Sequence, residues 1–316
     1  MFEELGVEYF SLGSYIDPRR PVDNIRPSLK SQPDEWLMQN APLRDKLTPE
    51  FVEYFDTIIV MHIPDWIKAN WEVIKNKRVV WRTIGQSTPE VERKLQPYRA
   101  EGLEVLRYSP REQNIKDNIG FDGMIRFYKD PNEFNHWVGA GTEIITFSQD
   151  MKNRGEYTNA DVWLDVIKGI KGNHSAKVYG PKNEEMGEFN GGFMSYDQMK
   201  QKMRDARAYL YTGTQPASYT LNFIEAMMTG VPIVALGPKY ANSLKLAGDT
   251  YEIPDIIQNG VNGFWSDDLN EVRGYLEALI TKKALANHIS KGGRETAIKL
   301  FGKENVKMFW RKYLNI

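Results

Sequence analysis

The stretch from Pro216 to Leu236 constrains the fold of this 316-residue chain most, because it joins a polar turn, a short helix and a buried strand. Ser218 or Thr220 can cap the helix, and Gly230 can take the left-handed conformation that ends it. Residues 231–236 have the apolar character of a strand buried on both faces, which is typical of a parallel α/β sheet. The free N–H groups in the first turn of the helix would be well placed to hold a phosphate.

The role of Glu225 within this helix is open from the segment alone. It lies just over one turn beyond Thr220, close enough to face a ribose hydroxyl pair if a nucleotide diphosphate occupied the helix end. In the alternative interpretation, Asn222 and Glu225 form a helix-capping pair and bind nothing.

The composition excludes several classes of site and partner. The chain has 42 acidic and 41 basic residues, so no global basic field indicates nucleic acid or an anionic membrane. Cysteine is absent, which removes disulfides, thiolate nucleophiles and cysteine-ligated zinc. No apolar run approaches the roughly 20 residues that span a bilayer, and the first residues lack the apolar core of a signal peptide. We therefore expect a soluble, cytoplasmic protein.

Strand and helix patterns alternate along most of the chain, which predicts parallel sheets with right-handed crossovers. An irregular connection over 126–141 separates two halves that share this architecture. We expect two Rossmann-like domains facing each other across a cleft, at 1–140 and 141–316. The expected strands are 7–12, 57–62, 78–84, 103–108, 143–147, 176–179, 208–211 and 231–236. The expected helices are 64–75, 88–100, 159–170, 196–206 and 220–229. After a turn-rich stretch that contains Phe264, two more helices close the chain, the first over 268–282.

Ligands of open parallel sheets bind beyond the carboxyl ends of the strands. Lys152 and Arg154 follow the strand at 143–147 and could reach a diphosphate, although an ordinary solvated loop would also carry such cations. The glycine pair in 190–195 would let the backbone approach a flat ring, or would simply make a turn. His62 follows a strand, where residues point into a cleft, but a lone histidine is more often structural.

The spacing of residues along the sequence does not match the motifs of several other kinds of binding or catalytic site. Gly139 and Gly141 lack a third glycine at 144 and precede a strand, which is the wrong order for a dinucleotide-binding fingerprint. The sequence also contains no phosphate-binding P-loop motif, no His-Glu-x-x-His, no Gly-x-Ser-x-Gly and no pair of aspartates two residues apart. With four histidines, a dedicated transition-metal site is disfavoured.

Taken together, these motifs resemble the retaining GT-B glycosyltransferases of the glycosyltransferase family 4 type. Residues 218–235 are similar to the phosphate-and-ribose element of that family, and 257–264 to its Asn-Gly-x-x-Gly turn. The end of the chain, 292–301 and 309–313, looks like the closing helices, the last of which usually crosses back to the first domain. The resemblance covers roughly residues 144–316 and implies a GT-B fold.

The resemblance also implies roles for individual residues. Glu225 would bind the ribose hydroxyls, and the backbone around Thr220 and Leu221 would meet the diphosphate. Arg154 stands where the family has a phosphate-binding lysine, and Gln149 where it has a partner arginine. The remaining implied contacts are Ser218 and Tyr219 at the start of the phosphate-and-ribose element, Lys152 near the diphosphate, the Gly192, Phe193 and Met194 backbone at the nucleobase, and His62 approaching the donor sugar.

The chain departs from the family at several positions. The family has a second glutamate eight residues before the ribose-binding one, and Ala217 stands there instead. Gln149 removes a charge from the diphosphate site, although Lys152 could compensate. Many members have a histidine after the strand that corresponds to 78–84, where this chain has Ile84, Gly85 and Gln86. We also expect the usual opening strand and glycine loop to be absent.

The resemblance implies a transferase that moves a sugar from a nucleoside diphosphate, with UDP favoured, to an acceptor bound mainly by residues 1–140. Configuration would be retained, with no metal and no tightly bound cofactor, and Arg154 and His62 would be the residues closest to the chemistry. The acceptor would be a glycan, a lipid or a small molecule. The alternatives are a phage-type DNA-base glycosyltransferase, because a loop over 13–47 carries Arg19, Arg20, Arg26 and Lys30, a catalytically inactive nucleotide-sugar-binding protein, and a GT-B phosphorylase or epimerase.

Overall fold

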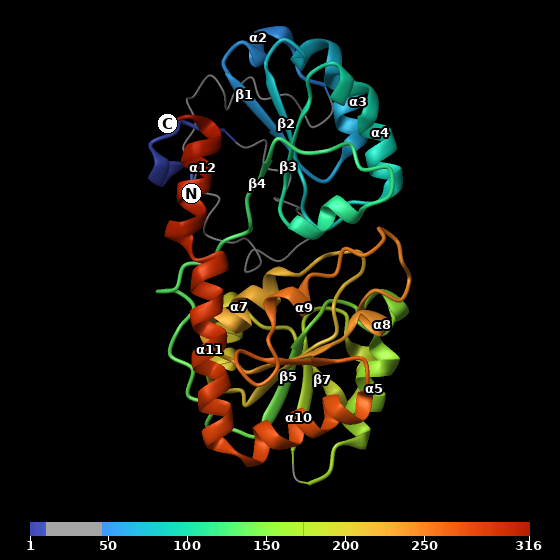
Figure 1. Cartoon of the computed structure of the whole chain (residues 1–316), viewed down its shortest axis with the longest axis vertical. Coiled ribbons are helices and arrows are strands. Elements are labelled where there is room, and N and C mark those ends of the chain that lie inside the picture. Colours follow the sequence, from blue (N-terminus) through green and yellow to red (C-terminus); the bar gives the residue numbers. More distant parts are fainter. Residues whose placement is uncertain (11–45, 173) are drawn as a thin grey trace. The chain divides into compact units, whose positions relative to one another are not determined.

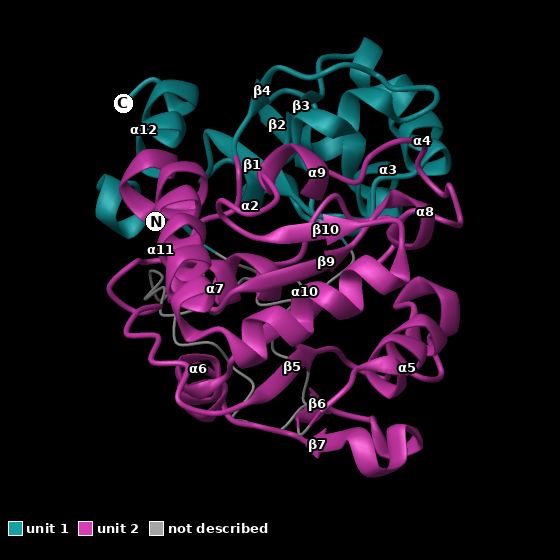
Figure 2. Cartoon of the chain, turned by 60° about the horizontal axis from the view of Figure 1, so that its bottom comes forward, with its two compact units in different colours: residues 1–125, 307–316 teal, residues 126–306 magenta. Residues whose placement is uncertain are grey.

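Two all-parallel sheets organise the chain (Figure 1). The computed structural model describes residues 1–10, 46–172 and 174–316. Its described part divides into unit 1, residues 1–125 and 307–316, and unit 2, residues 126–306 (Figure 2). The four cations expected in the loop at 13–47 lie outside the described residues, and residues 7–10 of the expected first strand have no strand structure.

Unit 1 contains a four-stranded sheet in the order β1-β2-β3-β4. Helices α3 and α4 begin within one residue of the starts expected from the sequence, and α2 was not expected. All three have proline in the first turn, where the missing N–H costs nothing. The elements are η1 (Glu3–Leu5), α2 (Pro49–Val52), β1 (Thr57–Val60), α3 (Pro64–Ile74), β2 (Arg78–Arg82), α4 (Pro89–Ala100), β3 (Glu104–Arg107), η4 (Pro110–Asn114) and β4 (Gly123–Met124).

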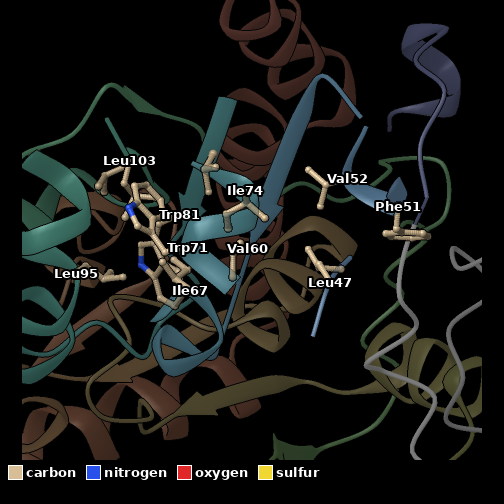
Figure 3. Close-up of a cluster of buried hydrophobic side chains, with 12 residues drawn as sticks. Leu47, Phe51, Val52, Val60, Ile67, Trp71, Ile74, Trp81, Leu95 and Leu103 are labelled. Carbon is tan, nitrogen blue, oxygen red and sulfur yellow. The ribbon is translucent and has the colours of Figure 1, made fainter. Parts of the chain in front are cut away.

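The core of unit 1 lies between this sheet and α2, α3 and α4 (Figure 3). Trp71 of α3 and Trp81 of β2 are both buried in it. The indole N–H of Trp71 donates to Glu101 at 2.7 Å, so the large ring is buried without losing its hydrogen bond. This hydrogen bond joins α3 to the end of α4.

Unit 2 contains a six-stranded sheet in the order β10-β9-β8-β5-β6-β7. Helix α10 contacts α5 and the strands β8 to β10, and α7 contacts α6 and α11. The elements are β5 (Glu143–Phe147), η5 (Gly155–Tyr157), α5 (Ala160–Gly169), β6 (Ser175–Tyr179), η6 (Glu184–Phe189), β7 (Asn190–Gly192), α6 (Tyr196–Asp205), β8 (Ala208–Tyr211), α7 (Leu221–Thr229), β9 (Ile233–Leu236), α8 (Pro238–Ala241), α9 (Ile253–Ile256), β10 (Phe264–Ser266), α10 (Leu269–Thr281) and α11 (Lys283–Phe301).

The last part of the chain differs most from the sequence expectation. Phe264, expected in a turn-rich stretch, begins strand β10, which pairs with β9. Three helices follow instead of two, because Gly302 interrupts the helical run between α11 and α12 (Lys303–Leu314) with extended backbone. The residues of α12 from 307 onward belong to unit 1, and unit 1 otherwise ends at 125, before the boundary expected near 140.

Within unit 1, polar and aromatic contacts hold the end of α12. Arg78 of β2 donates to Glu104 of β3 at 2.8 Å, and the Tyr313 hydroxyl donates to the same carboxylate at 2.6 Å. The Trp310 ring meets the Phe2 ring edge-on at 5.1 Å. The segment 307–316 is therefore part of the packing of unit 1.

Candidate functional site

Unit 2 has a cavity at the carboxyl ends of β5 and β8. These two strands are neighbours in the sheet, but the chain leaves β5 toward β6 and leaves β8 toward β9, in opposite directions. Such a switch point opens a crevice in which ligands of parallel sheets bind. The cavity measures about 190 Å³, below the roughly 300 Å³ at which complete small-molecule pockets begin, so it matches one part of a nucleotide-sized ligand.

The wall contributed by α7 is the start of that helix. Thr220 is the N-cap, and its hydroxyl accepts a hydrogen bond from the Phe223 amide at 3.4 Å. Asn222 does not act as a cap, because its side-chain amide donates to the Phe147 carbonyl at 3.1 Å and ties the first turn of α7 to the end of β5. Thr220 and Asn222 both line the cavity, so the positive end of the helix dipole is beside it.

The opposite wall is the loop after β5, which carries Gln149 and Arg154. Asn183 holds this loop, because its side-chain amide donates to the Ser148 carbonyl at 2.7 Å and its oxygen accepts from the Met151 amide at 2.9 Å. A side chain at Gly180 would collide with the same Ser148 carbonyl, so glycine is required there. Arg154 is exposed and is the only charged residue among the described residues that line the cavity.

Lys152, expected near the same diphosphate, has a different environment. It pairs with Asp161 of α5 and does not line the cavity. Since an exposed pair of this kind contributes little energy, Lys152 can exchange partners, but in the structure its charge is directed at Asp161.

Glu225 has a buried cation as its partner, which the sequence did not reveal. The side chain of Glu225 has no exposed surface, and its carboxylate pairs with the ammonium group of Lys129. The Lys129 backbone is itself fixed, because its amide donates to Phe301 at 2.9 Å and its carbonyl accepts from Lys303 at 3.1 Å. Glu225 is not among the residues that line the cavity.

The residues just before α7 are supported in a similar way. Tyr219 is buried, and its ring packs against Phe301 at 5.2 Å. The guanidinium group of Arg126 lies 5.8 Å from the Tyr219 ring and pairs with Glu252. The Ser218 carbonyl accepts from the Glu252 amide at 3.1 Å. Ser218 and Tyr219 thus hold the start of α7 in place through these contacts, and neither lines the cavity.

The residues expected at a nucleobase form a separate surface of unit 2. Gly192 ends the edge strand β7 with φ +81°, and its carbonyl accepts from the Gly180 amide at 3.0 Å. Phe193 is 45% exposed, and Met194 is half-buried. These residues do not line the cavity, but Gly180 connects them with the loop that carries Gln149 and Arg154.

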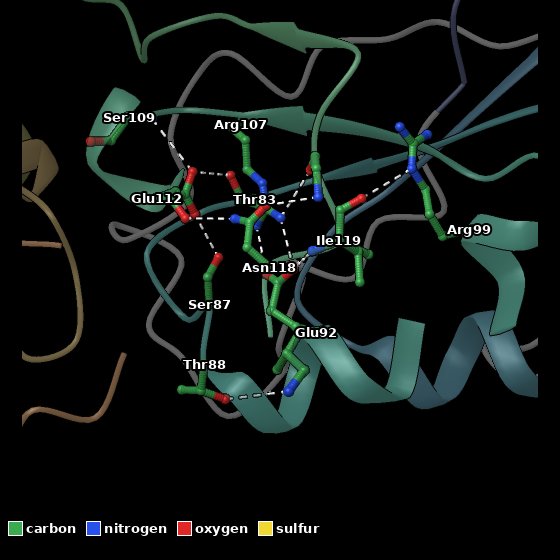
Figure 4. A network of polar contacts seen from close by, with 12 residues as sticks. Thr83, Ser87, Thr88, Glu92, Arg99, Arg107, Ser109, Glu112, Asn118 and Ile119 are labelled. Atoms are coloured by element: carbon green, nitrogen blue, oxygen red, sulfur yellow. Dashed lines mark hydrogen bonds and ion pairs between the residues drawn. The ribbon is translucent and has the colours of Figure 1, made fainter. Parts of the chain in front are cut away.

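In unit 1, His62 follows β1 with φ +69° and is exposed. Its Nδ1 lies 3.3 Å from the Gln86 side-chain oxygen, which fits an Nδ1–H tautomer that donates. The loops after β2 and β3 are joined by Glu112, which accepts hydrogen bonds from the Thr83 and Ser87 hydroxyls, both at 2.6 Å (Figure 4). Burial raises the pKa of Glu112, while its hydrogen-bonding neighbours act in the opposite direction.

The structure therefore brings together some of the residues that the sequence predicts to bind the donor. Gln149, Arg154 and Thr220 line one cavity, and Leu221 is the first residue of the helix that ends there. Lys129 and Tyr211 are the residues that sequence reasoning missed. Lys129 lies in a stretch without periodicity, and Tyr211 ends an expected strand, so no local signal distinguished either.

No family model matches the chain, and no curated protein matches it by sequence. Solved structures do match. HepE from Anabaena in complex with UDP aligns over 84% of this chain and 80% of its own, with 14% identity and a TM-score of 0.66. The chain has the GT-B fold. Sucrose-phosphate synthase from Thermosynechococcus elongatus aligns over 84% and 77%, with 14% identity and a TM-score of 0.62. The lipopolysaccharide outer core galactosyltransferase WaaB aligns over 89% of this chain and 77% of its own, with 14% identity and a TM-score of 0.54.

Two kinds of feature are not found among the described residues. Across residues 1–10, 46–172 and 174–316, no helix is both long and apolar enough to cross a membrane. The same residues contain no group of three or more His, Cys, Asp or Glu side chains that could hold a metal ion.

Proposed function

We propose that this protein is a glycosyltransferase that moves a sugar from a nucleoside diphosphate, with UDP favoured, to an acceptor. The observation that carries the proposal is the cavity at the switch point of the unit 2 sheet, with Arg154 on one wall and the start of α7 on the other. The GT-B neighbours that were solved with UDP or UDP-glucose support it.

The chemistry follows from the charges around that cavity. As the sugar leaves, negative charge develops on the diphosphate, and groups placed in advance to meet that charge lower the barrier. Arg154 supplies a planar guanidinium fork, and the amides of Leu221 and Asn222 belong to the first turn of α7, whose N–H groups have no intrahelical acceptor. Gln149 adds neutral hydrogen bonding on the same wall.

The nucleoside end and the sugar end are assigned by resemblance. Glu225 would hold the ribose hydroxyls, with Lys129 fixing its carboxylate, and the backbone at Gly192, Phe193 and Met194 would meet the nucleobase. His62 would approach the donor sugar. Ala217 replaces the carboxylate that the family uses at the sugar, so we expect sugar selection to differ from that of other members.

We further propose retention of configuration, no requirement for a metal, and a glycan, lipid or small-molecule acceptor bound mainly by unit 1. Retention is tested by the anomeric configuration of the product. Metal independence is tested by turnover in EDTA: unchanged rates with and without Mg²⁺ support it, and loss of turnover that Mg²⁺ restores contradicts it.

A panel of UDP-, GDP- and ADP-sugars, followed by thermal shift and by nucleotide release, tests the function as a whole. Stabilisation by one donor together with slow release of its nucleotide supports a transferase. Lack of response to every nucleotide would rule out the proposal.

Ala217 and Gln149 favour one second candidate, a nucleotide-sugar-binding protein without catalysis. Stabilisation by a donor without release in the presence of any acceptor would identify it. A DNA acceptor predicts binding that weakens steeply with added salt, since phosphate contacts release counterions.

A further inference from the structure

The hydroxyl group of Tyr211 is a buried polar group without a hydrogen-bond partner in the described part of the chain. Tyr211 is the last residue of β8 and is only 3% exposed, yet it lines the cavity between β5 and β8. Two other buried tyrosines of unit 2 are satisfied: the Tyr209 hydroxyl accepts from the Phe147 amide at 3.3 Å, and the Tyr251 hydroxyl donates to the Leu236 carbonyl at 2.9 Å. A buried hydroxyl without a partner destabilises a fold, so the exception at Tyr211 needs an explanation.

Thr220 is a polar neighbour of this hydroxyl, but it does not satisfy it. Burial raises the pKa of Tyr211 well above its ordinary value, and the side chain and backbone of Thr220 lower it to a smaller extent. The two groups are therefore close, but no hydrogen bond of normal geometry joins them. The Thr220 hydroxyl already accepts from the Phe223 amide as the cap of α7. Tyr211 thus remains protonated near neutral pH and can donate.

The cavity around Tyr211 suits an acceptor-rich anion. Its described lining carries one cation, Arg154, and no carboxylate. The nine-residue helix α7 presents its N-terminus to the same space, and Thr212 and Thr214 add further polar side chains. All of these groups complement the oxygens of a phosphate. A ligand part of that kind would also fill a cavity of about 190 Å³ better than would a whole nucleotide sugar.

We propose that the Tyr211 hydroxyl donates a hydrogen bond to a diphosphate oxygen of the bound nucleotide, which makes Tyr211 a donor-binding residue. This inference rests on the proposed function and goes beyond it, because neither the motif nor the resemblance assigns a role to this position. The hydroxyl offers a neutral donor on the sheet side of a site in which Gln149 has replaced a charged residue.

Tyr211→Phe tests this role, with Tyr251→Phe as the matched control. Each variant removes one buried hydroxyl from unit 2, but Tyr251 does not line the cavity. The probes are UDP, inorganic pyrophosphate and uridine, measured by calorimetry, together with the melting temperature of the ligand-free protein.

We expect Tyr211→Phe to weaken UDP and pyrophosphate about 10-fold, which is typical of a hydrogen bond to a charged group, and to leave uridine unchanged. The ligand-free melting temperature should stay the same or rise, because no protein hydrogen bond is lost. Tyr251→Phe should show the reverse: a lower melting temperature and unchanged UDP binding.

Unchanged UDP and pyrophosphate affinity in Tyr211→Phe would overturn the inference and leave the proposed function intact. An equal loss for uridine, or a ligand-free protein destabilised as much as Tyr251→Phe, would also overturn it. If the wild-type protein binds none of UDP, GDP and ADP, the proposed function fails as well, so the two failures are distinguishable.

Discussion

At the scale of single residues, Arg154 and Lys152 are two cations that look equivalent in the sequence but have different surroundings in the structure. Arg154 lines the cavity, whereas Lys152 pairs with Asp161 outside it. We predict that Arg154→Gln lowers kcat about 10²- to 10³-fold, as the loss of one preorganised donor does in an oxyanion site, and that Lys152→Gln changes kcat less than threefold. Steady-state kinetics with saturating donor measures both. Equal effects of the two substitutions would contradict this assignment.

Also at this scale, the ion pair of Lys129 and Glu225 makes Glu225 a structural residue as well as a candidate ligand. Removing one partner leaves the other charge buried without compensation. We predict that Lys129→Met destabilises the protein by about 3 to 5 kcal/mol and Glu225→Ala by a similar amount. Urea unfolding at neutral pH gives both values.

The double variant Lys129→Met with Glu225→Leu is the control for that pair. Because it removes both charges, we expect it to cost less than the two single changes added together. Additive losses would show that the two side chains do not stabilise each other. Loss of UDP binding by Glu225→Ala can be assigned to ribose contacts only after this stability effect has been measured.

At the scale of elements, the end of α12 depends on a pH-sensitive contact in unit 1. The hydrogen bond from Arg78 lowers the pKa of Glu104 below its ordinary value near 4.5, against the effect of burial, and the Tyr313 hydroxyl lowers it further. A carboxyl group whose pKa is lower in the folded protein than in the unfolded chain stabilises the fold at pH values above its unfolded-state pKa. This stabilisation is lost as the pH falls through the folded-state pKa.

Glu104→Gln should therefore cost about 1 kcal/mol at pH 7, since the pair is partly exposed, and progressively less below pH 4.5. Urea midpoints of the variant and the wild type, compared from pH 7 to pH 3, measure the difference. A difference that does not shrink in acid would show that the Glu104 charge is not what holds α12.

The elements also show how far the sequence could predict this molecule. Helix α7 was predictable, because the cap at Thr220 and the stop at Gly230 are local signals that the structure confirms. Strand β9 starts later than expected because Pro232 has no N–H for the ladder. Strand β10 was not predictable, because the three residues from Phe264 to Ser266 become a strand only through pairing with β9.

The site could be predicted only in part for the same physical reason. Arg154 and Thr220 were found because loops after strands and starts of helices are recognisable in the sequence. Lys129 was not found, because its partner lies 96 residues away and the pairing depends on tertiary packing. Tyr211 fell in an expected strand, and whether its hydroxyl has a partner depends on the geometry of β8 and α7 together.

At the scale of the whole molecule, the division into two units predicts that stability and nucleotide binding can be separated. All described residues lining the cavity belong to unit 2, while Trp310 is buried in unit 1. Trp310→Ala should destabilise unit 1 by about 3 kcal/mol through loss of core packing and leave the UDP dissociation constant within twofold of wild type. UDP at 100 times its dissociation constant should still stabilise unit 2 by about 2.7 kcal/mol.

Trp163→Ala is the matched change in unit 2. Trp163 is fully buried in α5, and its indole N–H donates to Thr146, which lines the cavity, at 2.8 Å. This variant should lose both stability and UDP affinity, because the cavity it creates lies beneath the site. Calorimetric unfolding with and without UDP, compared across the two tryptophan variants, measures the separation. A Trp310→Ala protein that no longer binds UDP would show that the nucleotide site depends on unit 1.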